Sequence, residues 1–274
     1  GMNSIHTTCP YCGVGCGVVA APDGRGGASI AGDHRHPANH GRLCSKGAAL
    51  GETLSLEDRL LHPEIDGRRV SWQRALDTVA QGIGDIVARH GPDAVAFYVS
   101  GQLLTEDYYA ANKLIKGFIG TANIDTNSRL CMASSVAGHK RAFGSDTVPG
   151  LYRDFEAADL VVLVGSNLAW CHPVLFQRLE AAKQARQHMK IVVIDPRRTE
   201  TCDIADLHLA VRPGSDVALF NALLAELDRR GVRDGSFVSQ HTHGLDDALA
   251  AAQAGDVGLC GVPAADVAIF FDWF

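Results

Sequence analysis

The N-terminal part of the sequence contains Cys9-Pro10-Tyr11-Cys12-Gly13-Val14-Gly15-Cys16, and a fourth cysteine follows within Gly41-Arg42-Leu43-Cys44-Ser45-Lys46-Gly47. Four thiolates are soft, charged ligands that suit an iron–sulfur cluster or a structural zinc ion. Zinc sites usually combine two CxxC pairs, whereas here a CxxCxxxC triplet is joined by one distant cysteine. The glycines of the triplet let the backbone wrap closely and direct its N–H groups at sulfur. The spacing therefore predicts a [4Fe–4S] cluster on these four cysteines, with structural zinc or a disulfide pair as the alternatives.

Composition places the chain among ordinary globular proteins. Its 274 residues are enough for one large domain or two, and they are 46% hydrophobic and 20% charged. The formal charge of −6 and the absence of a basic run argue against a nucleic-acid partner. The sequence has no apolar stretch of about 18 residues, so we expect no membrane partner. The cysteine triplet begins too early for an export leader to precede it, which predicts reduced thiols and a cytoplasmic location.

Residues 1–60 are predicted to form a small β-rich module that carries the cysteines. Two short apolar runs, 17–20 and 28–31, are separated by Asp23-Gly24 and Gly26-Gly27, which is typical of strands joined by a turn. Three histidines in this segment are interpreted as solvated loop residues rather than ligands: His34, His36 and His40.

Residues 61–140 show an alternation of helix and strand. Ser71 is a candidate N-cap for a helix that ends before Gly91-Pro92, with a periodic apolar face. A buried strand over 94–99 and a helix over 106–118 should follow. Because strands and helices alternate, we expect an α/β portion with a parallel sheet.

The same alternation continues through 141–274, where we expect an α/β domain that resembles a dinucleotide-binding one. Strands are predicted over 159–165 and 190–195, and helices over 174–188 and 215–230. In open sheets of this type, ligands bind in the loops at the carboxyl ends of the strands. No GxGxxG or Walker motif is present, which argues against an ordinary nicotinamide or ATP site.

Together these motifs resemble the molybdopterin-dependent oxidoreductases, which bind a bis(molybdopterin guanine dinucleotide) cofactor beside a [4Fe–4S] cluster. The resemblance runs from Thr8 to the C-terminus. It implies a β-rich iron–sulfur module followed by Rossmann-like α/β portions, of the type seen in domains 1–3 of formate dehydrogenase and dimethyl sulfoxide reductase. It also implies that the four cysteines ligate the cluster and that Lys46 lies between cluster and pterin. A positive charge there would separate two electron carriers.

The second chemical motif is Asn127-Ser128-Arg129-Leu130-Cys131-Met132. Alone, Cys131 is as a rule a packed free cysteine. In the family it matches the residue whose sulfur binds molybdenum. Formate dehydrogenases of the family place histidine directly after that residue, whereas this chain has Met132. The motif with Met132 resembles that of the cytoplasmic assimilatory nitrate reductases and, secondarily, that of the periplasmic ones. The resemblance therefore implies reduction of nitrate to nitrite.

Further residues match cofactor-contacting positions of the family, the last five less securely because they also read as ordinary turn residues at strand ends. These are Gln102, Asn127, Gly165, Ser166, Asn167, Asp195, Arg197, Arg198, Gly214 and Asp216. The three remaining cysteines match no ligand and are expected to be buried free thiols: Cys171, Cys202 and Cys260.

Catalytic subunits of the family are much longer than this chain, and an apolar helical pattern from Pro263 continues to Phe274 without a capping residue. We therefore expect an N-terminal part of a larger enzyme, with nitrate as substrate and an electron-donor protein or reductase subunit as partner. The alternatives are a formate dehydrogenase of the same family, a non-catalytic iron–sulfur electron-transfer subunit, and a zinc-stabilised α/β binding protein.

Overall fold

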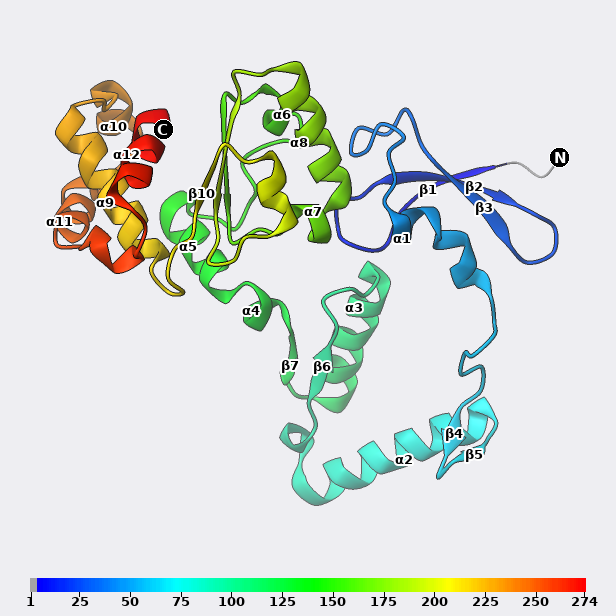
Figure 1. Cartoon of the computed structure of the whole chain (residues 1–274). Coiled ribbons are helices and arrows are strands. Elements are labelled where there is room, and N and C mark those ends of the chain that lie inside the picture. Colours follow the sequence, from blue (N-terminus) through cyan, green and yellow to red (C-terminus); the bar gives the residue numbers. More distant parts are fainter. Residues whose placement is uncertain (1–3) are drawn as a thin grey trace. The chain divides into compact units, whose positions relative to one another are not determined.

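The computed structural model describes residues 4–274, apart from the side chains of Ser128 and Arg129 (Figure 1). The chain divides into two compact units. One combines the segment that ends at Ser55 with Gly150–Phe274, and the other is Leu56–Pro149. The α/β class with parallel sheets is confirmed, and the three-part domain division stays a prediction.

The N-terminal segment of the first unit is a three-stranded antiparallel sheet in the order β1-β2-β3. The register pairs Thr8 with Gly17 and Val18 with Gly32. Between β2 and β3, the amide of Gly27 donates to Oδ1 of Asp23 at 3.0 Å, which closes the expected turn. The elements are β1 (Ile5–Thr8), β2 (Gly17–Pro22), β3 (Ala28–Gly32), α1 (Ser45–Ala48) and the 3-10 helix η1 (Leu50–Leu54).

The second part of this unit is a three-stranded parallel sheet in the order β10-β9-β8, with helices on both faces. Its strands are β8 (Leu160–Val164), β9 (Lys190–Ile194) and β10 (Leu207–Leu209). Its helices are α6 (Asp154–Ala157), α7 (Leu168–Cys171), α8 (Pro173–Ala185), η4 (Glu200–Ile204), α9 (Asp216–Arg230), α10 (Gly235–His241), α11 (Leu245–Gln253), η5 (Val257–Cys260) and α12 (Ala264–Trp273).

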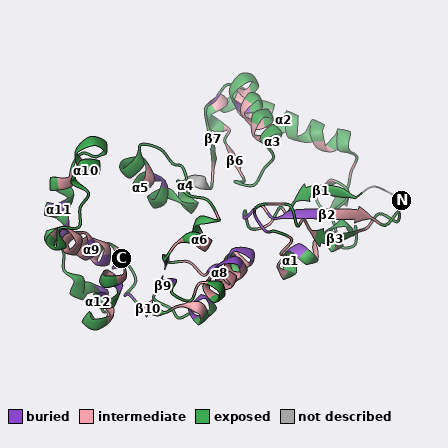
Figure 2. Cartoon of the chain, turned by 90° about the horizontal axis from the view of Figure 1, so that it is seen from above, coloured by how far each residue is buried: buried purple, intermediate pink, exposed green. Residues whose placement is uncertain are grey.

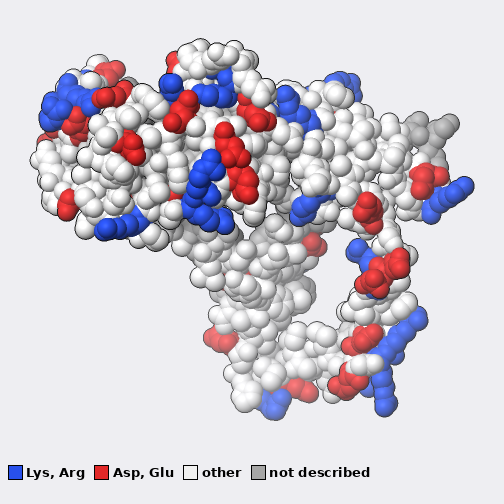
Figure 3. All heavy atoms as spheres, viewed as in Figure 1, with Lys and Arg blue, Asp and Glu red and all other residues white. Residues whose placement is uncertain are grey.

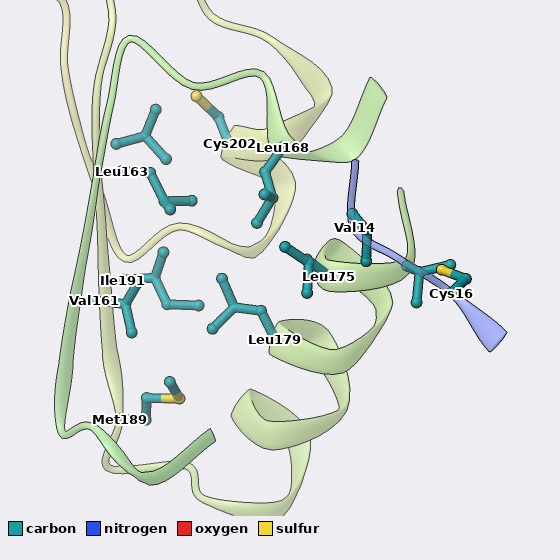
Figure 4. Packing of buried hydrophobic residues seen from close by; sticks show 12 residues of the cluster. Val14, Cys16, Val161, Leu163, Leu168, Leu175, Leu179, Met189, Ile191 and Cys202 are labelled. Atoms are coloured by element: carbon teal, nitrogen blue, oxygen red, sulfur yellow. The ribbon is translucent and has the colours of Figure 1, made fainter. Parts of the chain in front are cut away.

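Strand β9 shows how the two faces of the sheet are used. Ile191 and Val193 point into a core with Leu175 and Leu179 of α8, which Figure 4 shows from close by. Their neighbours Val192 and Ile194 point the other way, into a core built with α9 and α12. Successive side chains of a strand face opposite sides, so a strand covered on both faces becomes a continuous apolar run.

The second unit contains a two-stranded parallel sheet that pairs Phe97 with Ile124. Thr121 Oγ1 donates to Oδ1 of Asp93 at 2.6 Å and links the approaches to the two strands. The elements are β4 (Glu64–Ile65), β5 (Arg68–Arg69), α2 (Trp72–His90), η2 (Pro92–Ala94), β6 (Phe97–Val99), α3 (Thr105–Asn112), the π-helix η3 (Lys113–Ile119), β7 (Ile124–Thr126), α4 (Ser128–Cys131) and α5 (Ala133–Phe143).

Helix α2 begins and ends as predicted, but its apolar face is not buried. Ser71 accepts a hydrogen bond from the Arg74 amide, and Gly91 ends the helix. Trp72 is nevertheless 66% exposed and Leu76 59% exposed, and Figure 2 shows the helix largely in the colour of exposed residues. The strand predicted to be buried is shorter than expected, and its central residue Tyr98 is exposed. Two strands offer too little surface to cover both a long helix and their own faces.

Charges of both signs are interspersed on the face of the molecule drawn in Figure 3. Within residues 4–274, no helix combines the length and the apolarity that a membrane span requires.

Candidate metal centre and cofactor edges

The four cysteines of the N-terminal segment lie close to one another. Cys16 is buried in the core, against which Cys9 and Cys44 pack. The amide of Cys9 donates to the carbonyl of Cys16 at 2.8 Å. Burial, and then the nearby thiols of Cys12, Cys9 and Cys44, raise the pKa of Cys16 to about 11. Three thiols that act electrostatically on Cys16 form, together with it, a concentrated set of soft ligands.

Two glycines shape the loop between Cys12 and Cys16. Gly13 and Gly15 both have φ of 78°, a left-handed conformation that costs any other residue about 1–2 kcal/mol. Neither position is crowded, so the backbone angle alone accounts for glycine. The two turns direct the intervening Val14 into the core, where it is 5% exposed.

Cys44 is held by the chain on both sides of it. Its Sγ accepts from the amide of the buried Gly47 at 3.5 Å, and hydrogen bonds of this kind tune an iron–sulfur cluster. Before it, the fully buried Asn39 donates to the carbonyls of Gly17 and Arg42 at 2.9 and 2.8 Å. The ligand loop is thereby tied to β2. The histidines nearby are exposed or half-buried, in agreement with the loop interpretation.

This arrangement of donors fits a [4Fe–4S] cluster, because it supplies four neighbouring thiols and an N–H group directed at sulfur. In the described part of the chain, Cys, His, Asp and Glu side chains nowhere gather in threes around one point as ligands of a single ion would. Lys46 follows Cys44 and is exposed, and its Nζ lies 4.2 Å from the centre of the Tyr11 ring. That contact places its positive charge beside the triplet.

The carboxyl edge of the β8–β10 sheet gathers the loops predicted to hold a dinucleotide. Gly165 donates its N–H to the carbonyl of Ile194, so the loops after β8 and β9 run side by side. Asn167 accepts from Thr201 at 3.0 Å across these loops. Asp195 forms a turn by accepting from the Arg197 amide at 2.8 Å. Of the remaining predicted residues of the edge, Ser166 and Arg198 lie on these loops, Gly214 follows β10, and Asp216 is the first residue of α9.

One buried hydroxyl of this edge has no hydrogen-bond partner, and the long helix that begins there has no side-chain cap. Among the described residues, the only buried side-chain polar atom without a hydrogen bond is Oγ1 of Thr199, whose residue is 4% exposed. At the start of α9, Ser215 turns its hydroxyl to the carbonyl of Arg212 at 2.6 Å and does not cap the helix. The start of a long helix without a side-chain cap and an unpaired buried hydroxyl suit a phosphate-bearing ligand. The edge therefore fits one nucleotide end of the cofactor.

The second unit brings together the residues predicted to lie nearest molybdenum. Gln102 follows β6 and Asn127 follows β7, so both lie at the carboxyl edge of this parallel pair. A Cβ added at Gly101 would lie 2.5 Å from Oδ1 of Asn127, so the Asn127 side chain lies against the loop that carries Gln102. The amide of Cys131 donates to the carbonyl of Asn127 at 2.7 Å, and its thiol is exposed. An accessible thiol can act as a metal ligand.

The remaining cysteines divide into two kinds. Cys202 and Cys260 are buried, as predicted, and Cys260 Sγ lies 3.6 Å from the carbonyl of Ser215. Cys171 is exposed, so its prediction as a buried thiol is wrong. It ends the short helix α7, whose apolar side is already covered through the buried Leu168.

Two family descriptions match the chain. The iron–sulfur domain of the molybdopterin oxidoreductases, described as the Fe4S4 domain, matches residues 2–55. The molybdopterin oxidoreductase domain itself matches residues 59–230. The first covers all four clustered cysteines, and the second covers Cys131 and all the predicted cofactor contacts except Lys46, which lies in the first.

Similar proteins include a nitrate reductase of Klebsiella oxytoca, 57% identical over 100% of this chain and 31% of the relative. A periplasmic nitrate reductase of Desulfovibrio desulfuricans is 45% identical over 80% of the chain and 30% of the relative. An assimilatory nitrate reductase of Haloferax mediterranei is 39% identical over 90% of this chain and 35% of the relative. The chain thus spans about a third of the length of these relatives.

Among solved structures, acetylene hydratase from Pelobacter acetylenicus superposes with a TM-score of 0.82. It is 23% identical, and the match covers 97% of this chain and 38% of that one. This likeness supports the fold.

Proposed function

Because the chain belongs to the molybdopterin oxidoreductase family, we propose that it is the part of a nitrate reductase that binds the iron–sulfur cluster and one side of the molybdenum cofactor. The observation that carries the proposal is the 57% identity with a nitrate reductase over the whole chain. The four neighbouring cysteines of the N-terminal segment and the Cys131-Met132 pair of the other unit are consistent with it.

At the cluster, Cys9, Cys12, Cys16 and Cys44 are the ligands. The core that buries Cys16 keeps water from one side of the site, while Cys12 stays exposed. Cluster binding requires the thiol protons to leave, and the positive charge of the iron ions would then offset the cost that burial places on the charged form of Cys16. The amide of Gly47 supports the thiolate of Cys44 through its N–H.

At the molybdenum end, Cys131 is the protein ligand, and the amides of Gln102 and Asn127 contact the cofactor. The nucleotide edge binds a guanine dinucleotide through Gly165, Ser166, Asn167, Asp195, Arg197, Arg198, Gly214 and Asp216. When bound, the bis(molybdopterin guanine dinucleotide) cofactor supplies the oxygen-atom transfer that turns nitrate into nitrite. The two arginines add positive charge where diphosphate oxygens would lie.

Lys46 serves as a charge and a hydrogen-bond donor between the two centres. Its ammonium is held against the Tyr11 ring, two residues after Cys44. We further propose an assimilatory enzyme in the cytoplasm that takes electrons from a donor protein or a reductase subunit. An assimilatory relative at 39% identity supports the assimilatory role, while a periplasmic relative at 45% identity represents the alternative location.

A chimera tests the function. This chain would replace the matching part of the Klebsiella oxytoca nitrate reductase, to which it is 57% identical. We expect anaerobically purified chimera to contain iron and molybdenum and to form nitrite with a reduced dye as donor. Cys131→Ala should abolish nitrite formation and leave the iron content unchanged.

The matched control is Cys171→Ala, which removes another exposed thiol and should retain activity. Formate oxidation in place of nitrate reduction would contradict the argument from Met132. Stoichiometric zinc without iron in the reconstituted 274-residue chain would instead contradict the cluster assignment.

A further inference from the structure

The loop that joins two of the proposed cluster ligands is anchored by the α/β part of its own unit. Val14, midway between Cys12 and Cys16, is 5% exposed and belongs to the core formed with α8. Figure 4 shows Val14 beside Leu175 of that helix. An apolar side chain that is buried among helix residues fixes the position of the loop that carries it. The reason is that a close-packed core has no room for the side chain elsewhere.

The backbone of the same residue is held as well. The hydroxyl of Tyr152, which precedes α6, donates to the carbonyl of Val14 at 2.9 Å. Burial, and next the thiols of Cys16 and Cys12, raise the pKa of this phenol. The loop therefore has one anchor for its side chain and one for its carbonyl.

The Tyr152 ring is itself held in place. The guanidinium carbon of Arg178 lies 5.9 Å from the centre of the ring. Arg178 also donates from Nη1 to the carbonyls of Pro37 and Ala38 at 2.9 and 2.7 Å. Because Arg178 packs against the Tyr152 ring, the ring has little freedom to move and its hydroxyl points in one direction. The hydrogen bond to Val14 is therefore preorganised.

We propose that Tyr152 is a positioning residue for the iron–sulfur cluster. Its hydroxyl fixes the carbonyl of Val14 and thereby the peptide planes of the Cys12–Cys16 loop, whose N–H groups tune the cluster by their direction toward sulfur. The inference rests on the proposed assignment of the cluster ligands. It assigns to a residue outside the cysteine motif a role in the retention and the reduction potential of the cluster.

The test compares Tyr152→Phe with the unchanged chain after anaerobic reconstitution with iron and sulfide. The variant keeps the ring and removes only the hydroxyl. We expect iron loss to a ferrous chelator to be about fivefold faster, the factor expected for one typical net hydrogen bond. We also expect a shifted midpoint potential and an altered electron paramagnetic resonance spectrum of the reduced cluster. Tyr98→Phe, which changes an exposed tyrosine of the other unit, should behave as the unchanged chain.

Two results would overturn the inference. One is an unchanged potential, spectrum and rate of iron loss in Tyr152→Phe. The other is faster iron loss with an unchanged potential and spectrum, together with a matching loss of stability in the metal-free protein, which would show a merely structural role. Val14→Ala provides a second test, because it removes the other anchor and should also accelerate iron loss. If the unchanged chain binds no iron, the ligand assignment fails first, and this outcome is distinguishable from a failure of Tyr152 alone.

Discussion

Arg178 and Glu156 form an ion pair in which Nε lies 2.6 Å from Oε1, and the arginine side chain is only 3% exposed while the carboxylate is 36% exposed. The same guanidinium donates to two carbonyls of the N-terminal segment. One buried cation thus links α6, α8 and the loop that precedes Cys44, which makes it a joint between the cysteine segment and the parallel sheet.

Arg178→Ala should lower the free energy of unfolding by about 3 kcal/mol, because it leaves two carbonyls and a carboxylate without their donor. Chemical denaturation of the metal-free protein measures this. Arg198→Ala is the control, since its pair with Asp203 is exposed on both sides, and it should cost less than about 0.5 kcal/mol. Equal effects of the two substitutions would show that burial of Arg178 contributes nothing.

The hydrogen bond from Arg178 also predicts a pH dependence. It is the main cause that holds the pKa of Glu156 below its ordinary value of 4.5. A carboxyl with a lowered folded-state pKa stabilises the protein above its ordinary pKa, and this contribution is lost as the pH falls through the folded-state value. The difference in unfolding free energy between the unchanged chain and Glu156→Gln should therefore be largest near neutral pH and shrink below about pH 4.5. A difference that grows on acidification would contradict the assignment.

In the metal-free protein, Cys16 should resist alkylation. Its pKa of about 11, against an ordinary 9.0, reduces the thiolate fraction at pH 8 by about a hundredfold, and the residue is also buried. Cys12 and Cys131 are exposed and should react with iodoacetamide first. Mass spectrometry of peptides after timed labelling measures the order. Labelling of Cys16 as fast as that of Cys12 would show that the thiol is accessible in solution.

Two glycine substitutions should have opposite signs. Gly15→Ala places a Cβ at φ of 78°, and although no atom lies within 4 Å of it, the backbone should cost about 1–2 kcal/mol. Gly82→Ala lies within α2, also in open space, and should stabilise its helix by about 0.5–1 kcal/mol. Denaturation midpoints test both. An unchanged denaturation midpoint of Gly15→Ala would show that the loop adopts another backbone conformation at no cost in stability.

The chimera is assayed with an electron donor that reduces it through the cluster. Under this condition, Lys46→Ala should slow nitrite formation roughly tenfold, which corresponds to an increase of about 1.4 kcal/mol in the activation free energy. Iron and molybdenum contents should stay unchanged, because Lys46 is a ligand of neither centre in the proposal. Lys46→Arg keeps the positive charge and should retain more activity. If Lys46→Ala forms nitrite as fast as the unchanged chimera, Lys46 has no role in electron transfer.

Local patterns in the sequence predicted much of the fold. The apolar runs that became β8 and β9 were recognised because both faces of these strands are covered, and Ser71 was recognised by its capping position. Strand β10 was missed, since Leu207-His208-Leu209 is short and carries a histidine. The exposed face of α2 could not be foreseen, because periodicity shows that a face is apolar and not that something covers it.

Some residues of the candidate site could likewise be identified from the sequence, and others could not. Ligand spacing is local, so the four cysteines could be identified from the sequence alone. Tyr152 and Arg178 could not, because the backbone carbonyls to which they donate lie 138 to 141 residues away, and no side-chain pattern records a backbone carbonyl. Asn39 was missed for a related reason: a buried asparagine that binds backbone groups resembles a loop residue in sequence.

The long separation between Val14 and Tyr152 has a consequence for synthesis on the ribosome. At about 5–20 residues per second, the tyrosine is added roughly 7 to 30 seconds after the loop that it holds. During that interval the nascent cysteine segment lacks its core partners and the buried surroundings of Cys16. Contacts that close so late fold slowly, and the thiols stay open to oxidation and to stray metal ions. We therefore expect delivery of the cluster to follow translation of α8 and not to accompany translation of the cysteines themselves.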